Sequence, residues 1–192
     1  MNRKFDIRNR ERLKAPERLK NMPPEQLVAS LSIAPGSTIL DVGCGVGFWT
    51  IPLARHIGAA GRVYAADISP EMLEALRDEM QEAGITNVEP LLSEESRVPL
   101  TDGSMDVVLM SCVYHELDDR ATMLAEIHRL LRPGGQFINL DWRKKETPSG
   151  PPLEHRLEVA TVQSEMTAAG FLEPREVDLY DYYFIVCGKK SR

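Results

Sequence analysis

The sequence predicts an α/β fold in which a doubly wound, mostly parallel sheet ends in an antiparallel hairpin. Three observations lead to this class. Short apolar and β-branched runs alternate five times with helical patterns, which is typical of βαβ units with parallel strands. Glycine and proline stand at nearly every junction between these runs. The last two strand-like runs are joined too tightly for a crossover helix, so they are expected to pair antiparallel.

The boundaries of the first elements follow from capping residues, prolines and glycines. Ser69 has the side chain of a helix N-cap and Pro70 suits the first helical position, so a helix begins here and runs to Gly84. The other helices of this half are expected from Pro23-Pro24 to Leu31 and from the glycine cluster to about His56. Strand-like runs lie between these helices, at residues 38–42, 62–67 and 88–92.

The second half continues the alternation and closes it with the hairpin. Residues 106–110 form a nearly continuous apolar run, which is typical of a strand covered on both faces. Apolar residues at helical spacing predict a helix over 119–131, which Arg132-Pro133-Gly134-Gly135 is expected to end before a strand at 136–140. The remaining expected elements are a proline- and glycine-rich loop at 147–152, a helix ending at Gly170 and strands near 175–179 and 183–187.

Length and charge indicate the domain organisation. The chain has 192 residues, 43% of them hydrophobic and 27% charged, which suffices for one globular domain but not for two full cores. Residues 1–20 carry eight basic and three acidic side chains, a local net charge of +5, whereas the other residues carry −11. We therefore expect a basic N-terminal arm at 1–22 and a single domain at 23–192. Because nucleic-acid binding needs a basic face, the acidic domain argues against a nucleic-acid partner.

The sequence predicts neither a membrane-spanning helix nor a disulfide-bonded or zinc-binding protein. No apolar stretch approaches the ~18 residues of a membrane-spanning helix, and the charged N-terminus lacks the apolar core of a secretory signal. The three cysteines, Cys44, Cys112 and Cys187, have no C-x-x-C spacing, so neither a disulfide framework nor a zinc ribbon is expected. We interpret them as structural residues and expect a cytoplasmic protein. The sequence carries no signal for an oligomeric state.

Three glycines at alternate positions follow the first strand, in the segment 41–47, which reads Asp-Val-Gly-Cys-Gly-Val-Gly. In a doubly wound sheet, ligands bind at this end of the strands. The competing pattern is the dinucleotide-binding loop G-x-G-x-x-G, but its third glycine would fall on Phe48. Asp41 would also repel a pyrophosphate, since no nearby lysine or arginine offsets its charge. The same carboxylate suits a positively charged ligand without phosphate, such as S-adenosylmethionine with its ammonium and sulfonium.

Four motifs resemble those of class I S-adenosylmethionine-dependent methyltransferases, and the overall pattern is similar to the small type 11 branch. The motifs are Ile39 to Gly47, Val63 to Leu73, Asp102 to Val108 and Arg129 to Gly135, and the resemblance covers residues 24–142. It implies a Rossmann-like sheet of seven strands. It also implies S-adenosylmethionine as the methyl donor and S-adenosylhomocysteine as the product.

The resemblance further implies a donor site. Its residues would be Asp41, Gly43, Gly45, Asp67, Ile68, Met72, Glu94, Glu95 and Ser111. The first two glycines would let the backbone approach the methionine moiety, and Asp41 would orient its ammonium. Asp67 would accept both ribose hydroxyls, and Ile68 and Met72 would lie against the adenine. At the adenine edge the family's usual Gly-Asp pair reads Ser-Glu here, ending at Glu94.

The segment Ser111–Glu116 ends the fourth strand, where this fold presents its transfer site. His115 is the best candidate for a general base, because imidazole titrates near neutral pH. The alternative is that His115 orients the following helix. Tyr114 is expected to form a pocket wall or to donate a hydrogen bond there. Asp141 is a candidate substrate contact, and since no second acid with an asparagine accompanies it, no metal is expected.

Together these residues predict an enzyme that transfers a methyl group from S-adenosylmethionine to a small-molecule acceptor by in-line displacement. Two alternatives stay open: a non-catalytic S-adenosylmethionine-binding module or partner subunit, and a nicotinamide-dependent oxidoreductase. The loop at 147–152 and the basic arm are expected to cover the cofactor. His56, His128 and His155 are expected on the surface, away from the strand ends.

Overall fold

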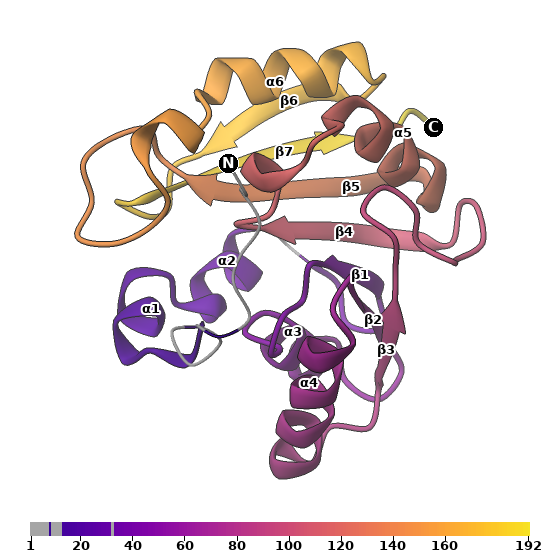
Figure 1. The fold of residues 1–192 in the computed structure, drawn as a ribbon. Coiled ribbons are helices and arrows are strands. Elements are labelled where there is room, and N and C mark those ends of the chain that lie inside the picture. The colour runs from indigo at the N-terminus through magenta and orange to yellow at the C-terminus, as the bar shows by residue number, and fades with distance from the viewer. Residues whose placement is uncertain (1–7, 9–12, 32) are drawn as a thin grey trace.

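A computed structural model of the chain describes residue 8 and residues 13–31 and 33–192. Most of the expected basic arm, at 1–7 and 9–12, lies outside the described residues. The described part forms one seven-stranded sheet in the order β3-β2-β1-β4-β5-β7-β6 (Figure 1). All neighbours pair in parallel except β7, which runs antiparallel to both β5 and β6. The predicted fold class and the C-terminal hairpin are therefore confirmed.

The elements fall close to their predicted positions. The strands are β1 Thr38–Val42, β2 Arg62–Asp67, β3 Val88–Leu92, β4 Met105–Ser111, β5 Leu131–Trp142, β6 Leu172–Val177 and β7 Tyr183–Lys189. The helices are α1 Pro16–Asn21, α2 Pro24–Ser30, α3 Thr50–Ile57, α4 Pro70–Ala83, α5 Arg120–Leu130 and α6 Val159–Ala168. Two short 3-10 turns, η2 Tyr114–Glu116 and η3 Leu153–His155, follow β4 and β5.

Helices cover both faces of the sheet, and the strands alternate between the two cores. Ile39 of β1 packs into the core beneath α2, α3 and α4, whereas Leu40 packs into the core beneath α5 and α6. Both side chains are fully buried. Figure 1 shows the two helical layers on either side of the strands. This burial on both faces explains why the central strands are apolar almost throughout.

The predicted boundary signals act locally as expected, as α4 illustrates. The Ser69 hydroxyl accepts a hydrogen bond from the Met72 amide at 3.2 Å, which caps the first turn. Pro70 occupies the first helical position. Gly84 ends the helix in the left-handed region at φ 65°, a conformation that glycine adopts without steric cost.

One predicted boundary is wrong, because β5 begins at Leu131 and not after the segment 132–135. The register between β4 and β5 shifts across this segment, which bulges out of the ladder. Lys190 accounts for the difference. Its backbone accepts from the Gly134 amide and donates to the Gly135 carbonyl, and its Nζ bonds two carbonyls at the end of α5. These long-range bonds hold the bulge as part of the strand.

The sheet places four strand ends together. The chain reverses its winding at β1, which lies between β2 and β4, and in such sheets this switch point is the usual ligand site. In Figure 1 the arrowheads of β4 and β5 point toward the side where α1 and the loop between β5 and α6 lie.

In the described part of the chain, no helix combines the length and the apolar character that crossing a membrane requires.

Candidate active site

A cavity of about 1190 Å³ lies at the carboxyl ends of β1, β2, β4 and β5. Its walls include the glycine loop, the β2–α4 connection, the segment after β4 and the loop at 148–152. Helix α1 closes a further side. Pockets for one small ligand commonly measure roughly 300–1,000 Å³, so this cavity has room for two ligands side by side.

The glycine loop lines one wall and is bonded to β2. The amides of Gly43 and Cys44 both donate to the Ala66 carbonyl, at 2.8 and 3.1 Å. Gly43 adopts φ 68°, and a Cβ there would lie 2.4 Å from Cγ2 of Val113, in the segment after β4. Only glycine allows the loop to turn here while another segment lies this close.

Replacing Gly43 with alanine is therefore expected to destabilise the fold through two separate effects. Gly84 is the control, since it adopts the left-handed conformation with φ 65° and has nothing within 4 Å of an added Cβ. Gly84→Ala measures the cost of the left-handed backbone, ~1–2 kcal/mol. Gly43→Ala should lower the free energy of unfolding by a further ~1–3 kcal/mol, because the methyl group clashes with Val113. Urea denaturation measures both changes, and equal values for the two variants would contradict the close approach.

Asp67 lies at the end of β2 and holds the loop from the other side. Its Oδ2 accepts from the Gly45 amide and its Oδ1 from the Ser69 amide, both at 2.9 Å. Burial raises the pKa of Asp67, and these backbone hydrogen bonds partly oppose the rise. Ile68 and Met72 line the cavity next to it, and Ile68 is 47% exposed. The carboxylate and the two apolar side chains thus form one continuous wall.

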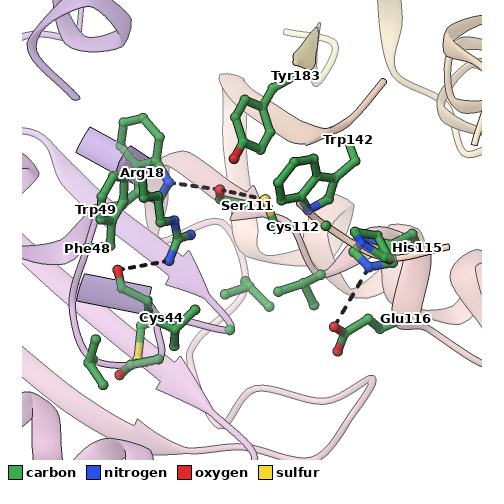
Figure 2. Close-up of a pocket in the computed structure, with 18 of the residues that line it drawn as sticks. Arg18, Cys44, Phe48, Trp49, Ser111, Cys112, His115, Glu116, Trp142 and Tyr183 are labelled. Atoms are coloured by element: carbon green, nitrogen blue, oxygen red, sulfur yellow. Dashed lines mark hydrogen bonds and ion pairs between the residues drawn. The ribbon is translucent and has the colours of Figure 1, made fainter. Parts of the chain in front are cut away.

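Most of the donor residues predicted from the sequence meet at this cavity. Those that line it are Gly43, Gly45, Asp67, Ile68, Met72, Glu94, Glu95 and Ser111. Glu95 also accepts from the Asp118 amide at 2.9 Å, which ties the cavity edge to the chain after η2. Ser111 accepts from the Trp49 indole at 2.8 Å, an interaction drawn in Figure 2.

Asp41 takes a different place, because it lies beneath the loop rather than in the cavity wall. It is 2% exposed, and the Thr50 hydroxyl donates to its Oδ2 at 2.6 Å. Burial raises the pKa of Asp41 to about 6, the Thr50 hydrogen bond lowers it and the nearby charge of Asp67 raises it further. Its negative charge thus reaches the cavity through the loop and not by lining the cavity.

The raised pKa of Asp41 predicts that ionisation of this buried carboxyl group lowers the free energy of unfolding. Its folded pKa of about 6 exceeds the unfolded value of 3.8, so the folded chain holds this proton more tightly, and the cost grows as pH rises above 3.8 until it is complete above 6. Since one pKa unit corresponds to ~1.4 kcal/mol, Asp41→Asn should raise the free energy of unfolding at about pH 8 by as much as roughly 3 kcal/mol. The gain should vanish near pH 4. Urea denaturation at both pH values measures it, and a gain at low pH alone would contradict the assignment.

His115 and Asp141 form a buried pair at the opposite wall. His115 Nδ1 lies 2.7 Å from Asp141 Oδ1, and the His115 amide donates to Oδ2 at 3.0 Å. With Nδ1 donating to Asp141, Nε2 keeps its lone pair, and it lies 3.8 Å from Glu116 Oε1 (Figure 2). Burial lowers the pKa of His115, but the charge and hydrogen bond of Asp141 together with the charge of Glu116 outweigh it and the net pKa is raised. Asp141, expected as a substrate contact, is thus the partner of His115.

Tyr114 corrects the prediction that it forms a wall of the acceptor pocket. Its side chain is fully buried away from the cavity, and its hydroxyl donates to Glu165 of α6 at 2.7 Å. Arg120 also contacts that carboxylate, at 2.7 and 3.0 Å. Burial and the neighbouring Glu165 raise the pKa of Tyr114. Tyr114 anchors the η2 turn to α6 and so positions His115, which follows it in the chain.

The structure adds residues that the sequence did not single out. His155, expected on the surface away from the strand ends, lines the cavity because the loop at 148–152 brings η3 back over the strand ends. Trp142 and Tyr183 form an aromatic wall, with ring centroids 4.4 Å apart. Arg18 of α1 completes the lining. His56 and His128 lie away from the cavity, as expected.

The cysteines are held as neutral thiols. Burial raises the pKa of Cys112 to about 12, that of Cys187 to about 11 and that of Cys44 well above its ordinary value. At neutral pH none of the three is a nucleophilic thiolate. Among the residues that the structure describes, no group of three His, Cys, Asp or Glu side chains could hold a metal ion.

Comparison with known proteins decides the family. Residues 39–135, half of the chain, match the family model of the methyltransferase domain. The chain belongs to the methyltransferase family. The structure of an S-adenosylmethionine-dependent methyltransferase from Aquifex aeolicus is similar over 97% of this methyltransferase and 99% of its own chain, with 34% identity and a TM-score of 0.93. A protein from Sulfolobus solfataricus assigned to the type 11 methyltransferases is similar over 90% of this chain and 94% of its own, with 26% identity and a TM-score of 0.72.

Curated relatives are similar over the same core. An arsenite methyltransferase from Halobacterium salinarum is 35% identical over 113 residues, and a demethylmenaquinone methyltransferase from Listeria welshimeri is 33% identical over 118 residues. These matches cover 59% and 62% of this methyltransferase but 29% and 50% of the relatives' own lengths. The comparisons confirm a class I methyltransferase with a Rossmann-like fold and S-adenosylmethionine as cofactor. Because the matching family is that of a methyltransferase domain, the oxidoreductase alternative is not retained.

The cavity fits this cofactor on its own geometry. The glycine loop lines the cavity, with Gly43 packed against Val113. Several carboxylates surround it, with Asp67 at the end of β2 and Asp41 beneath the loop. These carboxylates favour a cation, in agreement with the charge of a sulfonium and an ammonium. Arg18 lies near enough to lower the pKa of Asp41, so the expectation that no basic side chain offsets the charge of Asp41 is wrong.

Proposed function

We propose that this methyltransferase transfers a methyl group from S-adenosylmethionine to a small-molecule acceptor, with His115 as the general base. One observation carries the proposal: a single cavity has the glycine loop and Asp67 on one wall and His115, backed by Asp141, on another. The volume of about 1190 Å³ leaves room for an acceptor beside the donor.

The residues of the donor site bind S-adenosylmethionine and orient it for the reaction. S-adenosylmethionine supplies a methyl group already activated on a sulfonium. The loop at Gly43 and Gly45 admits the methionine moiety, Asp67 accepts the ribose hydroxyls, and Asp41 adds negative charge beneath the ammonium. Ile68 and Met72 provide the apolar surface for the adenine, with Glu94 and Glu95 at its edge. Alignment of donor and acceptor for in-line displacement can lower the barrier by up to ~7–11 kcal/mol.

On the acceptor side of the cavity, His115 removes a proton from the acceptor. His115 Nε2 takes the proton of the acceptor as its atom bonds to the methyl carbon, and Asp141 stabilises the imidazolium through Nδ1. Such a base contributes ~10²–10⁴-fold in rate. The aromatic wall of Trp142 and Tyr183 excludes water from this side and favours an acceptor with an apolar or aromatic body.

The proposal extends to location and partners. Three free cysteines support a reducing compartment, for which we propose the cytoplasm. The net charge of −6 supports a small molecule rather than a nucleic acid as the acceptor.

A labelled-donor screen tests this function. The protein is incubated with methyl-labelled S-adenosylmethionine, below saturation, and separate pools of small molecules, peptides and nucleic acids, and the Asp67→Ala variant with weakened donor binding is tested beside it. We expect label in a small molecule that gains one methyl group, and less label with the variant. Labelling confined to peptides or nucleic acids would overturn the acceptor class.

A further inference from the structure

The aromatic wall of the cavity carries two hydrogen-bond donors without partners. Trp142 ends β5 and Tyr183 begins β7, and the two residues are neighbours in the antiparallel ladder. Tyr183 is only 3% exposed, yet its hydroxyl has no hydrogen-bond partner among the described residues, and Figure 2 shows it directed into the cavity. The indole nitrogen of Trp142, which also lines the cavity, likewise has no partner within that part of the chain.

The other buried tyrosines show how unusual the Tyr183 hydroxyl is. The hydroxyl of Tyr114 donates to Glu165 at 2.7 Å. That of Tyr180 donates to the Pro23 carbonyl at 2.8 Å. Buried polar groups are normally paired in this way, because an unpaired one loses its hydrogen bonds to water without replacement. Burial raises the pKa of Tyr183, so its hydroxyl keeps the proton at neutral pH and remains a donor for a ligand.

The wall lies on the acceptor side of the cavity. Most of the predicted donor-site residues follow β1, β2 or β3, whereas β5 and β7 lie beyond β4 in the sheet. Trp142 follows Asp141 in β5, and Asp141 holds the proposed base His115 through Nδ1. A molecule that presents an atom to Nε2 of His115 therefore lies beside the aromatic wall.

Arg156 fixes this wall in place. Its side chain is buried and donates to four backbone carbonyls of the segment 143–151, at distances of 2.7 to 3.4 Å. Its Cζ lies 5.2 Å from the centroid of the Trp142 ring. A Cβ at Gly150 would lie 2.9 Å from Cε3 of the same ring, so the segment packs closely against it. Because the ring is held before a ligand arrives, binding costs less conformational entropy.

The charges around the cavity disfavour an anionic acceptor. The acidic residues that line it are Glu17, Asp67, Glu94, Glu95 and Glu116, and the basic ones are Arg18 and Lys20. An anion would enter against this excess of negative charge. A carbonyl oxygen has two lone pairs and accepts the same hydrogen bonds without carrying a charge.

We propose that the Tyr183 hydroxyl binds a carbonyl oxygen of the acceptor, and that the acceptor is an uncharged aromatic compound. The inference rests on the proposed function and narrows its acceptor class. The Trp142 ring contacts the aromatic body and its indole N–H is a second donor. With the carbonyl held at this wall, another atom of the same molecule reaches Nε2 of His115 and receives the methyl group. Tyr183 thus determines specificity, because a site built to bond a polar group rejects analogues that lack it.

Binding of three small fragments to the protein saturated with S-adenosylhomocysteine tests the proposal. Acetophenone has an aromatic ring and a carbonyl group, ethylbenzene has a methylene group in its place, and benzoate has a carboxylate. Saturation-transfer NMR titrations give the dissociation constants. The wild-type protein should bind acetophenone more tightly than benzoate. Tyr183→Phe keeps the ring and should weaken acetophenone ~3–10-fold while ethylbenzene is unchanged, since one hydrogen bond is lost.

Tyr180→Phe is the matched control. It also removes the hydroxyl of a buried tyrosine, but one that donates to Pro23. The affinities for all three fragments should stay at their wild-type values in this variant. Calorimetry of S-adenosylhomocysteine with each protein checks the donor site independently of the fragments.

The other outcomes separate the causes. Unchanged binding of acetophenone to Tyr183→Phe, or equal weakening of acetophenone and ethylbenzene, would overturn the role of the hydroxyl. Weaker binding of S-adenosylhomocysteine to this variant would place Tyr183 in the donor site and overturn the proposal as well. A preference for benzoate, or no binding of any fragment to the wild-type protein, would overturn the acceptor class. Failure of the wild-type protein to bind S-adenosylhomocysteine would contradict the proposed function itself, not this assignment alone.

Discussion

Replacing His115 with alanine is expected to lower the turnover of methyl transfer by ~10²-fold or more while the affinity for S-adenosylhomocysteine barely changes. The imidazole acts on the proton of the acceptor, so its loss removes an interaction made during the reaction and not in donor binding. The acidic limb of the pH–rate profile should disappear, since a neutral imidazole is no longer required. Steady-state kinetics over a range of pH, with calorimetry of S-adenosylhomocysteine, measures both effects.

The partner of His115 supplies a second test. In the wild-type protein the acidic limb should lie above the ordinary histidine value of 6.5, because the attraction of Asp141 and Glu116 outweighs the effect of burial. Asp141→Asn keeps a hydrogen-bonding side chain but removes the charge, so the limb should move to lower pH. If His115 only orients the loop, His115→Ala should instead weaken donor binding ~10-fold, lower the melting temperature and keep the shape of the profile. That outcome would remove the catalytic role.

Replacing Asp67 with alanine is expected to reduce donor affinity at least ~10-fold, since the ribose hydroxyls lose a charged acceptor whose hydrogen bonds contribute ~1.5–3 kcal/mol. Asp67 also accepts from the Gly45 and Ser69 amides, so part of the loss comes through the loop. Asp67→Asn retains an acceptor oxygen and should lose less. Calorimetry with S-adenosylhomocysteine measures the three affinities, and circular dichroism checks the fold. An unchanged dissociation constant in a folded Asp67→Ala variant would remove Asp67 from the site.

The donor half of the site could be predicted because its determinants are local. Alternate glycines after an apolar strand restrict the loop to one kind of turn, and the carboxylate at Asp67 follows the neighbouring strand directly. Parallel strands then bring both ends to one edge of the sheet. The resemblance to known methyltransferases rests on these same segments.

The other half depends on contacts between distant segments. Tyr114 lies beside His115 in the chain, but α6 draws its hydroxyl away to Glu165, 51 residues further on. His155 enters the cavity because a loop folds back, and no periodicity signals that return. Arg18 is one of eight basic residues in the first twenty, and only the docking of α1 distinguishes it. The start of β5 likewise depends on Lys190.

The central claim is that the glycine loop and Asp67 form a binding site for S-adenosylmethionine and not for a dinucleotide. Calorimetric titration of the wild-type protein with S-adenosylhomocysteine and, separately, with NAD tests it most directly. The account predicts saturable binding of S-adenosylhomocysteine that Asp67→Ala weakens, and no binding of NAD. Tight binding of NAD with no response to S-adenosylhomocysteine would contradict it.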